Sequence, residues 1–148
     1  MENNFIKIHS TKDIIIISIL IIIGILLAIL PIGGAINVTG YILIVIGALL
    51  IPFYKNGYKD AWEGKSYIKK EYYFANNRKA ELIASVIDHP QNITIEEQDK
   101  GNTLRLIVFY SKESGRAFLQ LQEYIPYKYE PCTDVVEHKV SQIGNLIK

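Results

Sequence analysis

The sequence predicts a membrane protein of the α+β class, with an N-terminal two-helix transmembrane hairpin followed by a small cytoplasmic α-β-β-β-α domain. Two observations predict this architecture. From Ile14 to Tyr54, 41 consecutive residues include no Asp, Glu, Lys, Arg or His, and a soluble domain within a chain of 148 residues cannot bury such a run. After residue 80, apolar residues at helical and then at strand spacing are separated by turn-forming residues, which indicates helices around an antiparallel meander.

The uncharged run divides into two predicted helices, at about 14–34 and 38–54, within a hairpin that covers residues 13–54. The segment 31–37 between them contains one proline, two glycines and an asparagine, which are turn formers. A cleaved signal peptide is the competing interpretation of the first helix, because two lysines precede it and small residues follow it. A retained anchor is favoured, since the apolar segment is long for a signal peptide and a second one follows at once.

Lysine and arginine placement predicts the orientation of the hairpin. Lys7 and Lys12 lie in the N-terminal tail, residues 1–12, and the turn between the helices has no basic residue. Seven basic residues follow the second helix within residues 55–79, against three acidic ones. The positive-inside rule therefore predicts a multi-pass protein with both termini in the cytoplasm. The 27 isoleucines and many lysines and asparagines suggest an A/T-rich coding sequence, so the membrane expected is the bacterial inner membrane. The lipid bilayer is thus the first expected partner.

The basic juxtamembrane segment 55–79 also carries aromatic residues that suit a membrane–water interface. The stretch 66–74 within this segment fits either an amphipathic helix or a strand. The residues predicted at the interface are Tyr54, Tyr58, Trp62, Lys55, Lys59 and Lys65.

Small residues on the two predicted helices suggest how the hairpin packs. Gly24 and Ala28 lie on the first helix, and Gly40 and Gly47 lie on the second. Small side chains let two helix backbones approach closely in lipid. We therefore expect the two helices to pack on each other through these positions.

The cytoplasmic domain, residues 80–148, begins with a short helix that Pro90 ends. Three strands are expected next, at 92–97, at 103–110 and from 115 or 116 to 125, with Ile93 and Ile95 facing inward. A capping box at Asp134 and Glu137 predicts a last helix. The apolar residues expected to be buried on the two helices are Ala80, Ile83, Val86 and Ile87 on the first, and Val136, Val140, Ile143 and Ile147 on the last.

Composition and motifs exclude most kinds of chemistry. The net charge of +1 argues against a nucleic-acid partner, and one cysteine excludes an intramolecular disulfide framework and a Cys-rich zinc site. There is no glycine-rich phosphate loop, HExxH motif or nucleophile elbow. The only possible catalytic pairs are Cys132 with His138 and Asp88 with His89, and neither has a supporting constellation. No catalytic, cofactor-binding or metal-binding residue is predicted.

Two features point to an interaction surface. The segment from Tyr124 to Pro131 contains Tyr124, Tyr127 and Tyr129 between prolines, which suits either a connector that packs its rings inward or a binding interface. The strand 103–110 is apolar on both faces, and two short helices cover only one face of a sheet. The face with Ile107 and Phe109 therefore needs a cover from residues 66–74, from the tyrosine segment, from a second copy, or from a different protein.

These observations favour a non-enzymatic membrane-anchored accessory or scaffold protein that presents a small cytoplasmic domain for protein–protein interaction. A protein partner or self-association is expected, because a domain of roughly 70 residues is marginally stable alone. The alternative is a membrane-anchored sensor or effector whose domain binds a ligand and drives oligomerisation of the hairpin. An enzyme that uses Cys132 or the pair Asp88 and His89 is the third hypothesis.

Overall fold

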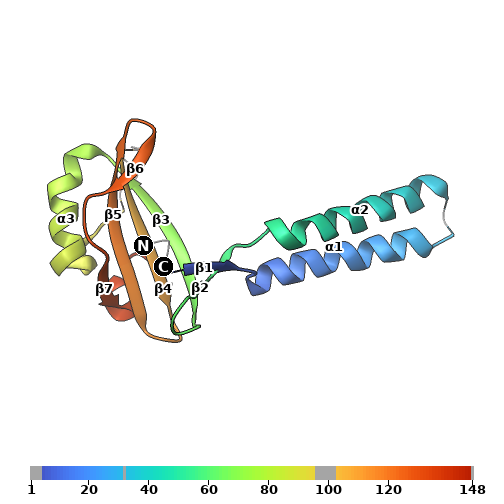
Figure 1. Ribbon diagram of the computed structural model, residues 1–148, viewed down its shortest axis with the longest axis horizontal. Coiled ribbons are helices and arrows are strands. Elements are labelled where there is room, and N and C mark those ends of the chain that lie inside the picture. The colour runs from blue at the N-terminus through green and yellow to red at the C-terminus, as the bar shows by residue number, and fades with distance from the viewer. Residues whose placement is uncertain (1–4, 32, 96–102, 148) are drawn as a thin grey trace. The chain divides into compact units, whose positions relative to one another are not determined.

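The chain is an α+β protein in which two long apolar helices are followed by an antiparallel meander sheet (Figure 1). The computed structural model describes residues 5–31, 33–95 and 103–147. The chain divides into a helical unit, Ile6–Tyr58, and a sheet unit, which joins Lys59–Lys148 to the N-terminal residues up to Phe5. The elements are β1 (Phe5–Ile8), α1 (Thr11–Ile29), α2 (Gly34–Phe53), β2 (Gly57–Asp60), β3 (Ser66–Phe74), α3 (Lys79–Asp88), β4 (Leu104–Ser111), β5 (Arg116–Ile125), β6 (Lys128–Pro131) and β7 (Val136–Lys139), with short 3-10 turns at Asn76–Arg78, Pro90–Asn92 and Val140–Ile143.

The helical unit confirms the two expected apolar helices and shifts their ends. The first begins at Thr11 rather than near residue 14, because Ser10 and Asp13 form a capping box at its N-terminus. It ends at Ile29, two residues before Pro31, whose ring cannot continue a helix. The second helix begins at Gly34, four residues earlier than predicted. Both helices are long and apolar enough to cross a membrane, judged by length and composition.

The two helices pack along glycines, as the small residues predicted. Gly24, Gly40 and Gly47 are all buried. A Cβ atom added at Gly40 would lie 2.5 Å from the backbone nitrogen of Ala28 and 2.7 Å from the carbonyl oxygen of Gly24. Real Cβ contacts are never this short, so this crossing requires glycine.

Polar side chains join the two helices at both ends of the hairpin. At the turn, the side-chain amide of Asn37 donates to the carbonyl oxygens of Leu27, Ala28 and Leu30 at 3.1, 2.9 and 2.9 Å. These carbonyls lie in the last turn of α1, where no backbone N–H is available to them. At the other end, the buried carboxylate of Asp13 accepts from the backbone and side-chain nitrogens of Asn56 at 2.8 and 2.9 Å.

The sheet unit is built on three long antiparallel strands in the order β3-β4-β5. Two short strands pair with the outer edge of β5: β6 pairs with the C-terminal half of β5, and β7 pairs with its N-terminal half. The predicted strands at 103–110 and 116–125 are therefore confirmed, and residues 66–74 are a strand. The central strand β4 is buried on both faces, as expected.

The strand predicted at 92–97 is wrong for the residues that the structure describes, and its last two positions lie outside them. Pro90–Asn92 forms a 3-10 turn, and residues 93–95 are not in a strand. Ile93 is buried as predicted, but Ile95 is half-exposed. The position beside β4 is taken by β3, because seven of its residues, Ile68–Phe74, pair with β4, a longer ladder than a short segment after a proline allows.

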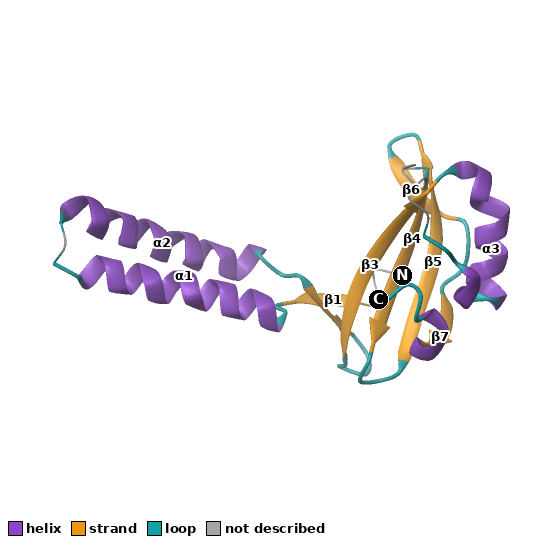
Figure 2. Ribbon diagram, turned by 180° about the vertical axis from the view of Figure 1, so that it is seen from behind, coloured by secondary structure: helices purple, strands orange, loops and turns teal. Residues whose placement is uncertain are grey.

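One face of the sheet carries the hydrophobic core, and α3 lies against it (Figure 2). Leu82 and Val86 of the helix and Ile143 and Leu146 near the C-terminus pack on this face. The buried face of α3 is rotated from the predicted one, because Ala80 and Ile87 are exposed whereas Leu82 is fully buried. The strand residues of this core are Phe74, Leu104, Leu106, Val108, Tyr110, Ala117, Leu119 and Leu121.

The predicted last helix is wrong. Val136–Lys139 is strand β7, and Val140–Ile143 is a single 3-10 turn. The backbone of β7 pairs with Arg116–Leu119, so the open edge of β5 determines its conformation. The apolar pattern of this segment nevertheless predicts correctly which side chains face the core. Ile143 is fully buried, and Val136, Val140 and Ile147 pack against the core.

Candidate interaction surface

The second face of the sheet holds Ile107 and Phe109, and both are fully buried within this chain. Phe5 stacks on Phe109 with ring centroids 4.1 Å apart and the planes inclined by 2°. Ile107 lies between its strand partners Glu71 and Gln120. Both side chains are therefore covered within this chain, Phe109 by Phe5 of the N-terminal segment, and a contact of Ile107 and Phe109 with another chain stays a prediction.

Phe5 is the centre of an aromatic cluster on the sheet unit. Its ring meets the rings of Tyr67 and Phe118 edge-on, with centroids 5.1 and 5.9 Å away. Perpendicular and stacked arrangements of this kind add to the free energy of burial. The cluster therefore binds the start of the chain to strands β3, β4 and β5.

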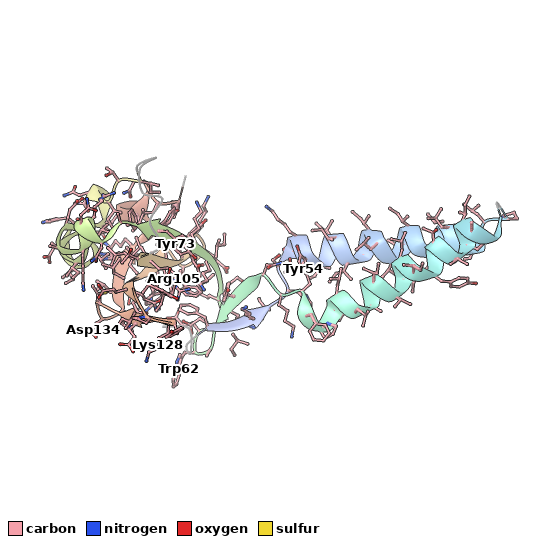
Figure 3. The ribbon with its side chains drawn as sticks, turned by 90° about the horizontal axis from the view of Figure 1, so that it is seen from above. Tyr54, Trp62, Tyr73, Arg105, Lys128 and Asp134 are labelled. Carbon is pink, nitrogen blue, oxygen red and sulfur yellow. The ribbon has the colours of Figure 1, made fainter. Side chains whose placement is uncertain are left out.

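The other end of the same face carries exposed aromatic rings around one arginine, and we call it the tyrosine surface. Its members are Tyr73, Arg105, Tyr124, Tyr127 and Tyr129. The guanidinium of Arg105 lies 4.3 Å from the ring centroid of Tyr129, and that ring lies 5.2 Å from the ring of Tyr124. Tyr73 is the strand partner of Arg105, and the two are labelled in Figure 3. Four elements of the unit, β3 to β6, thus contribute to one surface.

Polar contacts hold Arg105 in place. Its Nε and Nη2 atoms donate to the side-chain oxygen of Gln122 at 3.1 and 2.6 Å. Glu71 lies 3.9 Å from Nη1 and accepts a hydrogen bond from the hydroxyl of Tyr73 at 2.8 Å. Contacts within the chain therefore already position Arg105 and Tyr73, which lowers the side-chain entropy that these two residues lose on association.

The contacts around Arg105 shift the pKa values of Glu71 and Tyr73. Burial raises the pKa of the Glu71 carboxyl, but the contacts with Lys69 and Tyr73 outweigh burial, so the pKa lies below its usual value. The hydrogen bond to Glu71 raises the pKa of the Tyr73 hydroxyl. Both shifts favour a charged Glu71 that accepts the hydrogen bond of a neutral Tyr73 beside Arg105.

The segment Tyr124–Pro131 forms a β-hairpin rather than a connector that packs its rings inward. Pro126 and Tyr127 form the turn between β5 and β6. Tyr127 is 97% exposed, and Tyr124 is 48% exposed. Tyr127 also has a φ of 79°, in the left-handed region that non-glycine residues rarely adopt.

The predicted membrane-interface residues fall in both units. Tyr54, Lys55 and Tyr58 belong to the helical unit, and the carbonyl of Tyr54 accepts a hydrogen bond from Nδ1 of His9 at 3.1 Å. Trp62 and its neighbouring lysines belong to the sheet unit, around the turn between β2 and β3.

The possible catalytic pairs lack the geometry of an active site. Burial raises the pKa of the Cys132 thiol, which opposes formation of a nucleophilic thiolate, and the helix predicted after it is absent. Nε2 of His138 lies 2.7 Å from the carbonyl of Val86, and His89 is the C-cap of α3. Within the described residues, no group of three His, Cys, Asp or Glu side chains is placed to hold a metal ion.

An open depression beside the turn between β4 and β5 is lined by Arg116, Glu137 and His138, among others. Arg116 pairs with Glu63 and, at 2.6 Å, with Glu137, and these contacts raise its pKa. The guanidinium of Arg116 therefore already meets two carboxylates, and Lys139 is a second cation in the lining of the depression. These ion pairs link the turn between β2 and β3 to β5 and β7.

Sequence reasoning missed Phe5, Asp13, Asn37, Tyr73 and Arg105. Ser10 and Asp13 have capping-box spacing, so that pair could have been found before the apolar run. Asn37 stands out as an amide among apolar residues. Tyr73 and Arg105 meet only through strand register, which no local pattern gives.

Comparisons of the chain with known protein families, with curated proteins and with solved structures find no match.

Proposed function

We propose that this chain is a non-enzymatic, membrane-anchored accessory protein, in which α1 and α2 span the lipid bilayer and the sheet unit offers the tyrosine surface to a protein partner. The exposure of the apolar side chains on both helices carries this proposal. In the most apolar windows of α1 and α2, only 17% and 11% of residues are buried, with mean hydropathies of 2.8 and 2.2. A core helix of a soluble protein would bury most of such residues.

The lengths of the helices suit this role. The 19 residues of α1 and the 20 residues of α2 extend roughly 30 Å at 1.5 Å per residue, which matches the hydrocarbon thickness of a bilayer. Asn37 satisfies backbone carbonyls at the turn, which lipid leaves without partners. The glycine contacts supply the close packing that stabilises helix pairs in lipid.

The contacts of α1 favour a retained anchor over a cleaved signal peptide. Phe5 precedes α1 and packs into the aromatic cluster of the sheet unit. Asp13 and Asn37 form hydrogen bonds between α1 and the residues that follow it. Cleavage after α1 would remove Phe5 and break both contacts.

The same contacts support one side of the membrane for the N-terminal tail and the sheet unit. The chain leaves the sheet unit before α1 and returns to it after α2, so it crosses a bilayer an even number of times. Lysines flank the hairpin at this side, and the turn residues described at 31 and 33–37 include none. We propose that this side is the cytoplasm of a bacterium.

The composition of the tyrosine surface suits a protein partner. Tyrosine and arginine are enriched among residues that dominate binding energy, because they bury a large area and keep polar groups available. The ring of Tyr124 is half-exposed although it packs against Tyr129, so a partner can cover it without rearrangement of the sheet.

Cysteine accessibility tests the anchor and its orientation together. In a Cys132→Ser background, Lys128→Cys places a thiol on an exposed side chain of the sheet unit, and Ala35→Cys places one at the turn of the hairpin. In intact spheroplasts, a membrane-impermeant maleimide should label Ala35→Cys and spare Lys128→Cys until the membrane is permeabilised. Labelling of Lys128→Cys in intact spheroplasts would overturn the orientation, and extraction of the chain by alkaline carbonate would overturn the anchor.

A further inference from the structure

The turn between β2 and β3 presents the indole of Trp62, which is 87% exposed. The turn is held from within, because the side chain of Asp60 accepts from the backbone nitrogens of Trp62 and Glu63 at 2.6 and 3.0 Å. The backbone nitrogen of Asp60 donates to the carbonyl of Lys65 at 2.9 Å, and Gly64 takes a φ of 68°. A large apolar ring is thus displayed on a rigid turn.

The charges around Trp62 favour an anionic surface. Lys59 and Lys65 flank the turn and are exposed. Of the acidic residues in the turn, Asp60 is occupied by backbone N–H groups, and Glu63 pairs with Arg116 and, at 3.6 Å, with Lys65. Glu63 is therefore shared between Arg116 and Lys65, and the exposed Lys59 adds a positive charge beside the turn that phosphate groups can attract.

The position of the turn in the chain brings a membrane within reach. Only residues 54–61 separate the end of α2 at Phe53 from Trp62. At about 3.3–3.6 Å per extended residue, the indole stays within roughly 30 Å of the end of the helix. The preference of tryptophan for the headgroup layer gives an exposed indole at this distance a favourable site.

We propose that the turn between β2 and β3 inserts Trp62 into the headgroup layer of the membrane, as a contact separate from the hairpin. This proposal rests on the proposed membrane anchor. It has a consequence for the sheet unit, because Figure 1 shows this turn and the turn between β5 and β6 at opposite ends of the sheet. The ten residues of β5 extend roughly 30 Å, so a membrane contact at Trp62 directs Tyr127 away from the bilayer.

Trp62 is the only tryptophan in the chain, so its fluorescence tests the proposal in the full-length protein. The protein is reconstituted into vesicles of phosphatidylethanolamine and phosphatidylglycerol. The emission should be shifted to the blue of a hydrated indole, quenched by lipids brominated near the headgroup, and protected from aqueous iodide. Replacement of Lys59 and Lys65 by glutamine should reduce the quenching by brominated lipid, because it removes the attraction to anionic headgroups.

A matched control moves the indole to the other end of the sheet. The double variant Trp62→Tyr, Tyr127→Trp keeps one tryptophan on an exposed turn and should show hydrated emission with full quenching by iodide. If Trp62 in the natural sequence is as accessible to iodide as this control, the proposal is wrong. Flotation of the same vesicles separates the two hypotheses: protein that does not float contradicts the anchor, whereas protein that floats with a hydrated Trp62 contradicts only the contact at this turn.

Discussion

Phe5 joins the beginning of the chain to strands β3, β4 and β5, which start more than sixty residues later. Its ring covers Phe109, which lies on the face of β4 opposite the main core. The sequence revealed that this face needs a cover, since alternate residues of the strand are apolar on both sides. It did not identify Phe5, because a single aromatic residue in a polar tail has no periodicity.

We expect Phe5→Ala to destabilise the sheet unit by about 2 kcal/mol, less than the 3–5 kcal/mol of a fully buried phenylalanine, because Phe5 is half-buried. Ile6→Ala is the control, since Ile6 is the next residue and is 56% exposed. Thermal unfolding in detergent, followed by near-ultraviolet circular dichroism, measures the difference. Equal stability of the two variants would show that the stacking on Phe109 contributes nothing.

At the scale of elements, some helices and strands follow from the local sequence pattern, whereas others depend on pairing between segments that are distant in the sequence. The helices α1 and α2, and the strands β4 and β5, follow from a charge-free run and from apolar spacing between turn formers. The segment Val136–Lys139 has helix-like spacing, but the open edge of β5 makes it a strand. Burial of Ile143 was predicted correctly even so, because apolar side chains are buried in either conformation.

The crossing of α1 and α2 depends on Gly40 more than on helix propensity. We expect Gly40→Val to push the helices apart, because its Cβ would lie 2.5 Å from the backbone nitrogen of Ala28. Overpacking of this kind costs about 1–3 kcal/mol. Gly34→Val is the control, since nothing lies within 4 Å of a Cβ added there.

Spin labels on the two helices measure this effect. Cysteines at the exposed positions Ile25 and Leu49, in a Cys132→Ser background, carry one label on each helix. The distance between labels in lipid should increase with Gly40→Val and stay constant with Gly34→Val. An unchanged distance in both variants would contradict a glycine-dependent crossing.

At the scale of the whole molecule, the two proposed contacts serve different partners. The turn that carries Trp62 is proposed to meet lipid, and the tyrosine surface at the far end of the sheet is proposed to meet protein. The tyrosines at 124, 127 and 129 were identified from composition, whereas Arg105 and Tyr73 were not. Their place on the same surface depends on the register of β3, β4 and β5, which is fixed only by the folded sheet.

A substitution at Tyr127 can change the binding of a partner without lowering the stability of the fold. The left-handed backbone of Tyr127 costs a non-glycine residue of order 1 kcal/mol or more, and its ring is almost fully exposed, so burial among the described residues does not offset this cost. A residue held in this way suggests that the ring serves binding rather than folding. We expect Tyr127→Gly to leave the stability of the sheet unit equal or higher, because glycine adopts the same φ without strain.

The same variant should weaken association by about tenfold or more, as expected for loss of an exposed ring that a partner buries. Copurification from native membranes with quantitative mass spectrometry measures association, and Ile87→Ser on α3 is the control, since Ile87 is 47% exposed on a different element. Loss of a second copy of this chain from the purified complex would identify the partner as itself, and loss of another protein would identify that protein. If Tyr127→Gly retains every copurifying protein and its oligomeric state, Tyr127 is not part of the interface, and the tyrosine surface loses its most exposed member.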